Sequence, residues 1–271
     1  MKTINMIPAL MVAILFAGKT QAQSEIKEQM VVPLSAPGKS CKIKVEALYG
    51  SIRVVGYEGK DVVVEVEAEK KNESSAGSGG GMKRIGGGGG EVTAEEDDNT
   101  VTVNAGVSHV KMISVKVPAN ATEVEVSTVN DGDITVNNVS GQIEINNVNG
   151  WIHCEGVSGS VVANTVNGDV TVGFKTVNPQ AAMAFSTLNG KVDVTFPATL
   201  KAKLKLKAEQ GDVFSDFDVA IEKGQTTAEK TGEGHMYRIA IEDWVYGSVN
   251  GGGPEIMMKT TNGSVYVRKE K

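Results

Sequence analysis

The stretch "NNVNGWIHCEGVSGSVVANTVNGDV", residues 146–170, repeats one short phrase three times and decides the fold. Each phrase has an asparagine or serine, then a glycine, and then a run in which alternate residues are mostly apolar. Asparagine and glycine are typical of tight turns, and period-two alternation is typical of a strand with one buried side. The stretch therefore predicts short β-strands joined by tight turns.

The turn glycines within residues 128–173 are spaced by nine residues each time, which marks a structural repeat. The residues two and four positions after each glycine are apolar, and the residue between them is usually polar. One side of every short strand is therefore predicted to be buried. The glycines are Gly132, Gly141, Gly150, Gly159 and Gly168, and the inward-facing pairs are Ile134 and Val136, Ile143 and Ile145, Ile152 and Cys154, Val161 and Ala163, and Val170 and Val172.

A period of eighteen residues contains the nine-residue one, because the phrases NVNG and TVNG alternate with VSG. Two non-equivalent strands per unit predict an all-β, single-domain β-solenoid, similar to a parallel β-helix, with about two strands in each 18-residue coil. An antiparallel β-sandwich is the alternative. It explains the nine-residue spacing but not the eighteen-residue alternation.

The regular phrases divide the chain into parts. Residues 23–271 are predicted to form one solenoid, with regular nonapeptides at 128–173 and weaker copies through the rest of 92–271. Residues 41–71 alternate in the same way and are expected to open the solenoid as its first coils. Between these parts, the glycine-rich composition of residues 72–91 predicts a flexible excursion.

The N-terminus has the pattern of a secretory signal peptide. Lys2 is followed by an apolar run of eleven residues, Ile7 to Ala17, and by small residues near Ala22. We expect residues 1–22 to be cleaved and the protein to be exported to the periplasm or the cell surface. A run of eleven residues is too short to cross a bilayer, so no membrane span is expected in the mature chain.

The charge balance argues against a nucleic-acid partner. The chain has 27 basic and 33 acidic residues, and without Lys2 and Lys19 of the leader the balance is 25 against 33, or −8. A net-negative protein binds nucleic acid poorly unless its basic residues cluster. The best cluster is "KAKLKLK", residues 201–207, and its alternation predicts a half-buried strand with a solvated lysine side.

Cofactor and metal motifs are absent from the sequence. The glycine-rich stretch has neither GxxxxGK[ST] nor GxGxxG, and the repeat lacks the second glycine of the calcium-binding phrase GGxGxD. His109, His153 and His235 stand singly, without metal-ligand spacing. We therefore expect no cofactor and no metal. Cys41 and Cys154 are expected to be buried thiols, and whether they form a disulfide stays open.

Several phrases together resemble the bacterial putative adhesin family, a domain of unknown function with short β-strand repeats. They are "GSIRVVGYEGKDVVVEVEAEKK" (50–71), "MKRI" (82–85), the nonapeptides, and "NGGGPEIMMKTTNGSVYVRKE" (250–270). The resemblance covers nearly all of the mature chain. It implies a secreted or envelope β-solenoid, with adhesion as the label of the family, and it offers no catalytic residues.

Trp151 is the candidate with the clearest chemistry. It occupies the outward position just after a turn glycine, and the eighteen-residue unit stacks it between Asp133 and Asp169, with His153 two residues further along. An exposed tryptophan flanked by carboxylates is typical of a sugar-stacking site. The simpler alternative is a tryptophan covered by another segment or by a second subunit.

Two non-enzymatic functions follow from these features. The first is an adhesin-like envelope protein that binds a surface glycan or an envelope protein through one solenoid face. The second is a structural, self-associating periplasmic scaffold whose coils stack end to end. A polysaccharide-active enzyme is the weakest reading, because residues 128–174 contain no lysine or arginine to stabilise a developing oxyanion.

Overall fold

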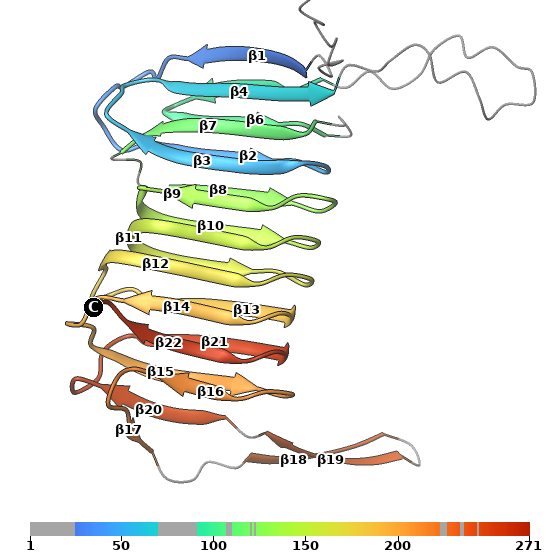
Figure 1. Ribbon diagram of the computed structural model, residues 1–271, viewed down its shortest axis with the longest axis vertical. Helices are drawn as coiled ribbons and strands as arrows, with labels where there is room; N and C mark the ends of the chain where they lie inside the picture. Colours follow the sequence, from blue (N-terminus) through green and yellow to red (C-terminus); the bar gives the residue numbers. More distant parts are fainter. Residues whose placement is uncertain are drawn as a thin grey trace, which may run out of the picture.

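The turn-and-strand phrase builds flat coils that stack along the long axis of the molecule (Figure 1). Every regular element of the described residues is a β-strand, and neighbouring coils pair in parallel. The predicted all-β solenoid is confirmed, and the antiparallel sandwich is not observed. The computed structural model describes residues 25–69, 91–106, 110–119, 121, 123–222, 227–233, 236–242 and 244–271; the predicted signal peptide and residues 72–90 lie outside this range.

The first strand of each coil lies on one side of the solenoid, called face A here. Its strands are parallel from one end of the stack to the other. In spatial order they are β6 (Thr100–Asn104), β2 (Lys42–Glu46), β8 (Glu123–Thr128), β10 (Ser140–Asn147), the second half of β11 (Ile152–Asn164), β13 (Met183–Asn189), β21 (Glu255–Asn262) and β15 (Ala202–Ala208).

The second strand of each coil lies on the opposite side, called face B here. These strands are also parallel and follow the same spatial order of coils. They are β7 (Met112–Pro118), β3 (Ser51–Tyr57), β9 (Ile134–Asn137), the first half of β11, β12 (Val170–Val177), β14 (Val192–Phe196), β22 (Val265–Lys269) and β16 (Val213–Ser215).

Antiparallel strands terminate the stack at both ends. At one end β4 pairs with β7, β1 with β4, and β5 with β6; at the other end β20 pairs with β15, and β17 with β20. A separate hairpin joins β18 to β19. The bounds are β1 (Glu25–Val32), β4 (Val62–Glu69), β5 (Thr93–Asp97), β17 (Ala220–Ile221), β18 (Thr227–Glu233), β19 (Met236–Glu242) and β20 (Val245–Val249).

The spatial order of the coils differs from the chain order at both ends. Strands β2 and β3 do not open the solenoid, as expected for residues 41–71, because their coil lies between the β6–β7 coil and the β8–β9 coil. Likewise the β21–β22 coil lies between the β13–β14 and β15–β16 coils. Every coil presents the same apolar pattern to its neighbours, so coils that are distant in sequence can stack.

The core lies between the two faces and follows the predicted inward positions. All ten inward residues of the 128–173 repeat are buried, and so are the alternate leucines of the lysine-rich strand, Leu204 and Leu206. Three phenylalanines fill the C-terminal half: Phe174 stacks on Phe196 with ring centroids 5.3 Å apart, and Phe185 meets both rings edge-on. Burial of this apolar column between coils is the main favourable free energy of the fold.

Glycine is required at one corner of the coils because the backbones approach closely there. A Cβ on Gly150 would overlap the carbonyl oxygen of Gly132, and a Cβ on Gly168 would overlap that of Gly150. Gly150 also has a φ of +150°, which L side chains rarely adopt. The same overlap recurs along the glycine column, whose members in spatial order are Gly50, Gly132, Gly150, Gly168, Gly190, Gly263 and Gly211.

The carbonyl groups of this corner accept hydrogen bonds from a second column of side chains. Thr165 Oγ1 donates to the Gly150 carbonyl over 3.0 Å, and Thr187 Oγ1 donates to the Gly168 carbonyl over 2.8 Å. Asn147, Thr260 and Thr128 do the same for Gly132, Gly190 and Gly50. These donors satisfy the backbone carbonyl groups of a corner that is too closely packed for any residue larger than glycine.

An asparagine ladder runs beside the glycine column on the outer surface. Each side-chain amide donates to the amide oxygen of the next asparagine in the stack, as in amyloid-like stacks. The bonds join Asn167 Nδ2 to Asn149 Oδ1 (2.8 Å), Asn189 Nδ2 to Asn167 Oδ1 (2.7 Å) and Asn262 Nδ2 to Asn189 Oδ1 (2.6 Å). The last of these bonds joins two residues that are 73 positions apart in sequence, so it helps to hold the β21–β22 coil next to the β13–β14 coil.

We expect Gly150→Ala to lower the free energy of unfolding by about 2–4 kcal/mol, because the new methyl group meets a backbone carbonyl that cannot move aside. Gly173→Ala is the matched control. A Cβ at Gly173 has its nearest neighbour, the Cys154 carbonyl oxygen, at 3.8 Å. This variant should stay within about 0.5 kcal/mol of the wild type. Urea unfolding followed by circular dichroism measures both, and equal effects would contradict the corner argument.

Candidate functional site

The predicted site residues lie around a shallow hollow on face B. The hollow has a volume of about 610 Å³ and is lined by side chains from three successive coils. This volume is in the range of small-molecule sites. The lining residues are Trp151, Ile152, His153, Gly168, Asp169, Thr171 and Lys191. Trp151, His153 and Asp169 of the predicted set therefore lie together, whereas Asp133 does not line the hollow.

Trp151 forms one wall of the hollow. It points outward because Ile152, the next residue, is buried in the core. Its side chain is 43% exposed, so the described part of the chain leaves much of the indole open. The His153 ring meets the indole edge-on, with centroids 6.2 Å apart and an angle of 83° between the planes. The hollow thus offers a flat apolar surface with a fixed orientation.

The two flanking aspartates hold the backbone of neighbouring coils. Asp133 Oδ1 accepts the Trp151 backbone N–H over 3.0 Å, and Asp169 Oδ1 accepts the Lys191 backbone N–H over 2.9 Å. In the register of the sheet His153 lies between Thr135 and Thr171, as the eighteen-residue unit predicts. The carboxylates therefore set the position of Trp151 and Lys191 as well as the polarity of the surface.

Thr171 and Lys191 are lining residues that the sequence did not single out. Thr171 is the neighbour of His153 in the next coil. Lys191 follows a coil of twenty-two residues, Gly168 to Gly190. The eighteen-residue spacing therefore did not place it in line with Trp151 and Asp169. The asparagine before each turn glycine marks the true register and could have identified Lys191.

A second group of aromatic side chains lies further along face B. Phe214 and Tyr266 stack with centroids 5.1 Å apart, and Phe214 is 48% exposed. The Arg268 guanidinium lies 5.0 Å from the Tyr266 ring centroid and forms two bonds to the Asp193 carboxylate, of 2.6 and 3.0 Å. The hydrogen bonds that Arg268 donates to the Asp193 carboxylate raise the pKa of Arg268. Face B therefore carries exposed aromatic rings at two places.

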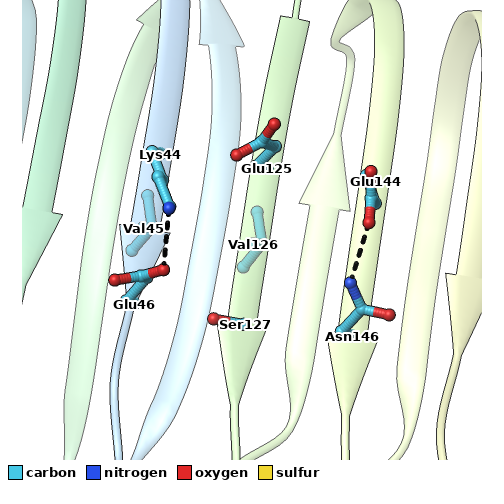
Figure 2. A pocket seen from close by; sticks show the side chains of 8 residues that line it. All are labelled: Lys44, Val45, Glu46, Glu125, Val126, Ser127, Glu144 and Asn146. Atoms are coloured by element: carbon cyan, nitrogen blue, oxygen red, sulfur yellow. Dashed lines mark hydrogen bonds and ion pairs between the residues drawn. The ribbon is translucent and has the colours of Figure 1, made fainter.

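A different hollow lies on face A, between β2, β8 and β10 (Figure 2). Its charged groups are largely compensated within the chain. Lys44 Nζ lies 3.0 Å from Glu46 Oε1, and Lys42 Nζ contacts Glu123 and Glu125 at 2.9 and 2.6 Å. The hydrogen bond from Lys42 lowers the pKa of Glu125. Most of the lining side chains of this hollow are charged or polar and none is aromatic, so it offers less of a stacking surface to a small ligand than the hollow on face B.

In the described ranges of the chain, no three histidine, cysteine, aspartate or glutamate side chains lie close enough together to hold a metal ion. His109 and His235 lie outside the described residues. His153 Nε2 is 3.9 Å from Glu155 Oε2 on the same strand.

Residues 84–243, more than half of the chain, match the family model described as Toastrack DUF4097. The chain belongs to this family. The family result supports the β-solenoid and, in part, the resemblance drawn from the sequence, since the matched model is also one of unknown function. No protein with a curated description matches the chain.

One solved structure is similar to this Toastrack chain. It is described as a putative cell adhesion protein from Clostridium sporogenes, with 10% sequence identity and a TM-score of 0.45. The match covers 91% of this chain and 100% of that chain.

Both cysteines are buried thiols of the core, as predicted. Burial raises the pKa of the Cys154 thiol to about 12 and also raises the pKa of Cys41. A thiol that stays protonated at neutral pH is a poor nucleophile, so these groups act as small core residues. Across the described residues, no helix has the length and apolarity needed to cross a membrane.

We expect neither thiol to react with iodoacetamide at pH 8 in the native protein, because both are buried and protonated. In 6 M guanidinium chloride both should react within minutes. Mass spectrometry of the two samples counts the added groups. Rapid labelling of the native protein would contradict the burial.

Above about pH 8.5 the unfolded state ionises its thiols while the native state does not, so the thiols make unfolding more favourable as the pH rises.

Proposed function

We propose that the protein is an exported, adhesin-like and non-enzymatic envelope protein that binds a glycan on face B. The observation that carries the proposal is the exposed Trp151 ring beside hydrogen-bonding groups in one hollow. The signal-like N-terminus supports export. The family membership is compatible with this role but does not assign it.

The chemistry of the hollow fits a sugar ring. A pyranose has an apolar face of C–H groups, which can stack on the indole, and a rim of hydroxyl groups, which need donors and acceptors. Asp169 supplies carboxylate acceptors, Lys191 supplies ammonium donors, and Thr171 supplies a hydroxyl that can do both. The indole and these polar groups come from three successive coils, so the rigid stack fixes their spacing.

The second aromatic group extends this surface. Tyr266 and Phe214 lie on the third and fourth coils beyond Trp151 in the order of face B, and coils are about 4.8 Å apart. The separation is therefore about 14–19 Å, which spans several sugar rings. An extended polysaccharide could contact both groups at once, and two weak contacts on one chain would add to its affinity.

The two carboxylates that flank Trp151 perform a structural task. Asp133 and Asp169 each bind a backbone amide of the adjoining coil, on either side of the Trp151 strand. A glycosidase needs one acid and one nucleophile or base placed on the two sides of the scissile bond. The hollow contains a single carboxylate, Asp169, among its lining residues, which favours binding without turnover.

We expect Trp151→Ala to weaken binding of the recognised polysaccharide at least about tenfold, or about 1.4 kcal/mol, with little change in melting temperature. Leu188→Ala is the matched control, because Leu188 is 45% exposed but lies outside the hollow. Binding is measured on an array of purified bacterial surface polysaccharides and host glycans, followed by calorimetry with the best ligand.

Two results would overturn the proposal. One is a wild-type protein that binds no glycan on the array, and the other is equal binding by Trp151→Ala and the wild type. A change in melting temperature or in oligomer size on Trp151→Ala, with no glycan bound, would favour the scaffold function instead.

A further inference from the structure

The outward charges of face A are segregated along the stack. Strands β5, β2, β8 and β10 at one end carry mostly acidic residues in outward positions, with two lysines among them. Strands β21 and β15 at the other end, with the residue before β15, carry mostly lysines. The acidic residues are Glu95, Asp97, Glu46, Glu123, Glu125 and Glu144, and the lysines of the other end are Lys259, Lys201, Lys203, Lys205 and Lys207.

The two coils in the middle of face A carry no outward charge. Strand β11 presents Ser160, Val162 and Asn164 there, and β13 presents Ala184 and Ser186. Val162 pairs with Ala184 in the register of the sheet, so a small apolar centre separates the acidic end from the basic end. The strands of the face lie side by side from coil to coil along the stack (Figure 1).

Ion pairs within the chain do not remove this asymmetry. Lys42 pairs with both Glu123 and Glu125, which leaves an acidic surplus at one end. At the other end Glu209 lies within 3.6 Å of Lys207 Nζ and 3.5 Å of Lys259 Nζ, and Lys205 and Lys207 lie under the Trp244 ring. Lys201 and Lys203 remain exposed.

We propose that face A is the interface of a symmetric dimer with a second copy of this chain. A two-fold axis parallel to the strands, between β11 and β13, reverses the order of coils in the partner. It places β8 of one protomer on β15 of the other, β10 on β21, and β11 on β13. Glu123 then faces Lys203, Glu125 faces Lys205, and Val162 faces Ala184 across the axis.

The size of the face suits this interface. Eight strands, from β2 to β20 in spatial order, overlap across the axis. At about 4.8 Å between strands and five residues along each strand, they give a surface of about 600 Å². A standard-size interface buries roughly this area on each partner, with an apolar centre and a polar rim. The pairing is isologous, so one surface serves both copies.

A second copy fits face A better than other occupants do. A polyanion would bind the lysines at one end, but the acidic end of the same face would repel it. End-to-end stacking is a less suitable mode of self-association, because antiparallel strands interrupt the parallel repeat at both ends of the described stack. The dimer also leaves face B, with the proposed glycan site, open on both protomers.

The test uses two charge-reversal variants of the purified protein. Lys201→Glu with Lys203→Glu replaces two of the five lysines at the basic end of face A by carboxylates, and Glu123→Lys with Glu144→Lys makes its acidic end more basic. Each variant alone should show at least a tenfold rise in the dimer Kd by sedimentation velocity, since like charges then meet across the axis. A 1:1 mixture of the two variants should form a heterodimer, because the acidic face of one then meets the basic face of the other.

The matched control is Lys39→Glu with Lys60→Glu, which makes the same change in charge as the first variant on two exposed turn residues outside face A. It should dimerise like the wild type, and the wild-type dimer should weaken between 0.05 and 0.5 M salt. The proposal is overturned by a wild-type protein that is monomeric at about 100 µM in low salt, or by reversal variants that dimerise as the control does. Circular dichroism of each variant separates loss of dimer from loss of fold.

Discussion

The close approach of backbones at the glycine corner is the constraint on which the rest of the structure depends. A side chain at Gly150 would overlap the carbonyl of Gly132, and the same holds for each step of the column. The corner therefore fixes how far apart the coils lie and how each coil is placed above the previous one. The threonines beside it donate hydrogen bonds to the glycine carbonyl groups that this approach brings together, and the asparagine ladder joins the same coils through its side chains. Packing of the core follows from that placement.

Because the register between neighbouring coils is fixed, side chains at equivalent positions of successive coils form columns on each face. Positions that are one coil apart along the chain become neighbours on a face, so a surface site is assembled from residues that no short motif contains. Trp151, Asp169 and Lys191 come together in this way. The acidic end and the basic end of face A are each assembled from successive coils in the same manner. The backbone bonds from Asp133 and Asp169 show that surface residues also take part in holding the stack. Asp169 therefore both lines the hollow on face B and holds the next coil in place.

The sequence predicts the local structure of the repeat well, because alternation and turn glycines act within nine residues. The burial of Ile152 and Cys154 and the position of His153 between two threonines both follow from it. The order of the terminal coils could not be predicted, because every coil offers its neighbours the same apolar pattern. Lys191 was missed for a related reason, since a coil of twenty-two residues shifts it out of the regular spacing.

The placement of the C-terminal coil has a mechanical consequence. Strand β22 is hydrogen-bonded to β14 on one side and to β16 on the other, although it is the last strand of the chain (Figure 1). A tensile load on the C-terminus must therefore break two ladders of backbone hydrogen bonds together, whereas a terminal strand at an edge would give way one bond at a time. A strand enclosed in this way resists peeling more than an edge strand does.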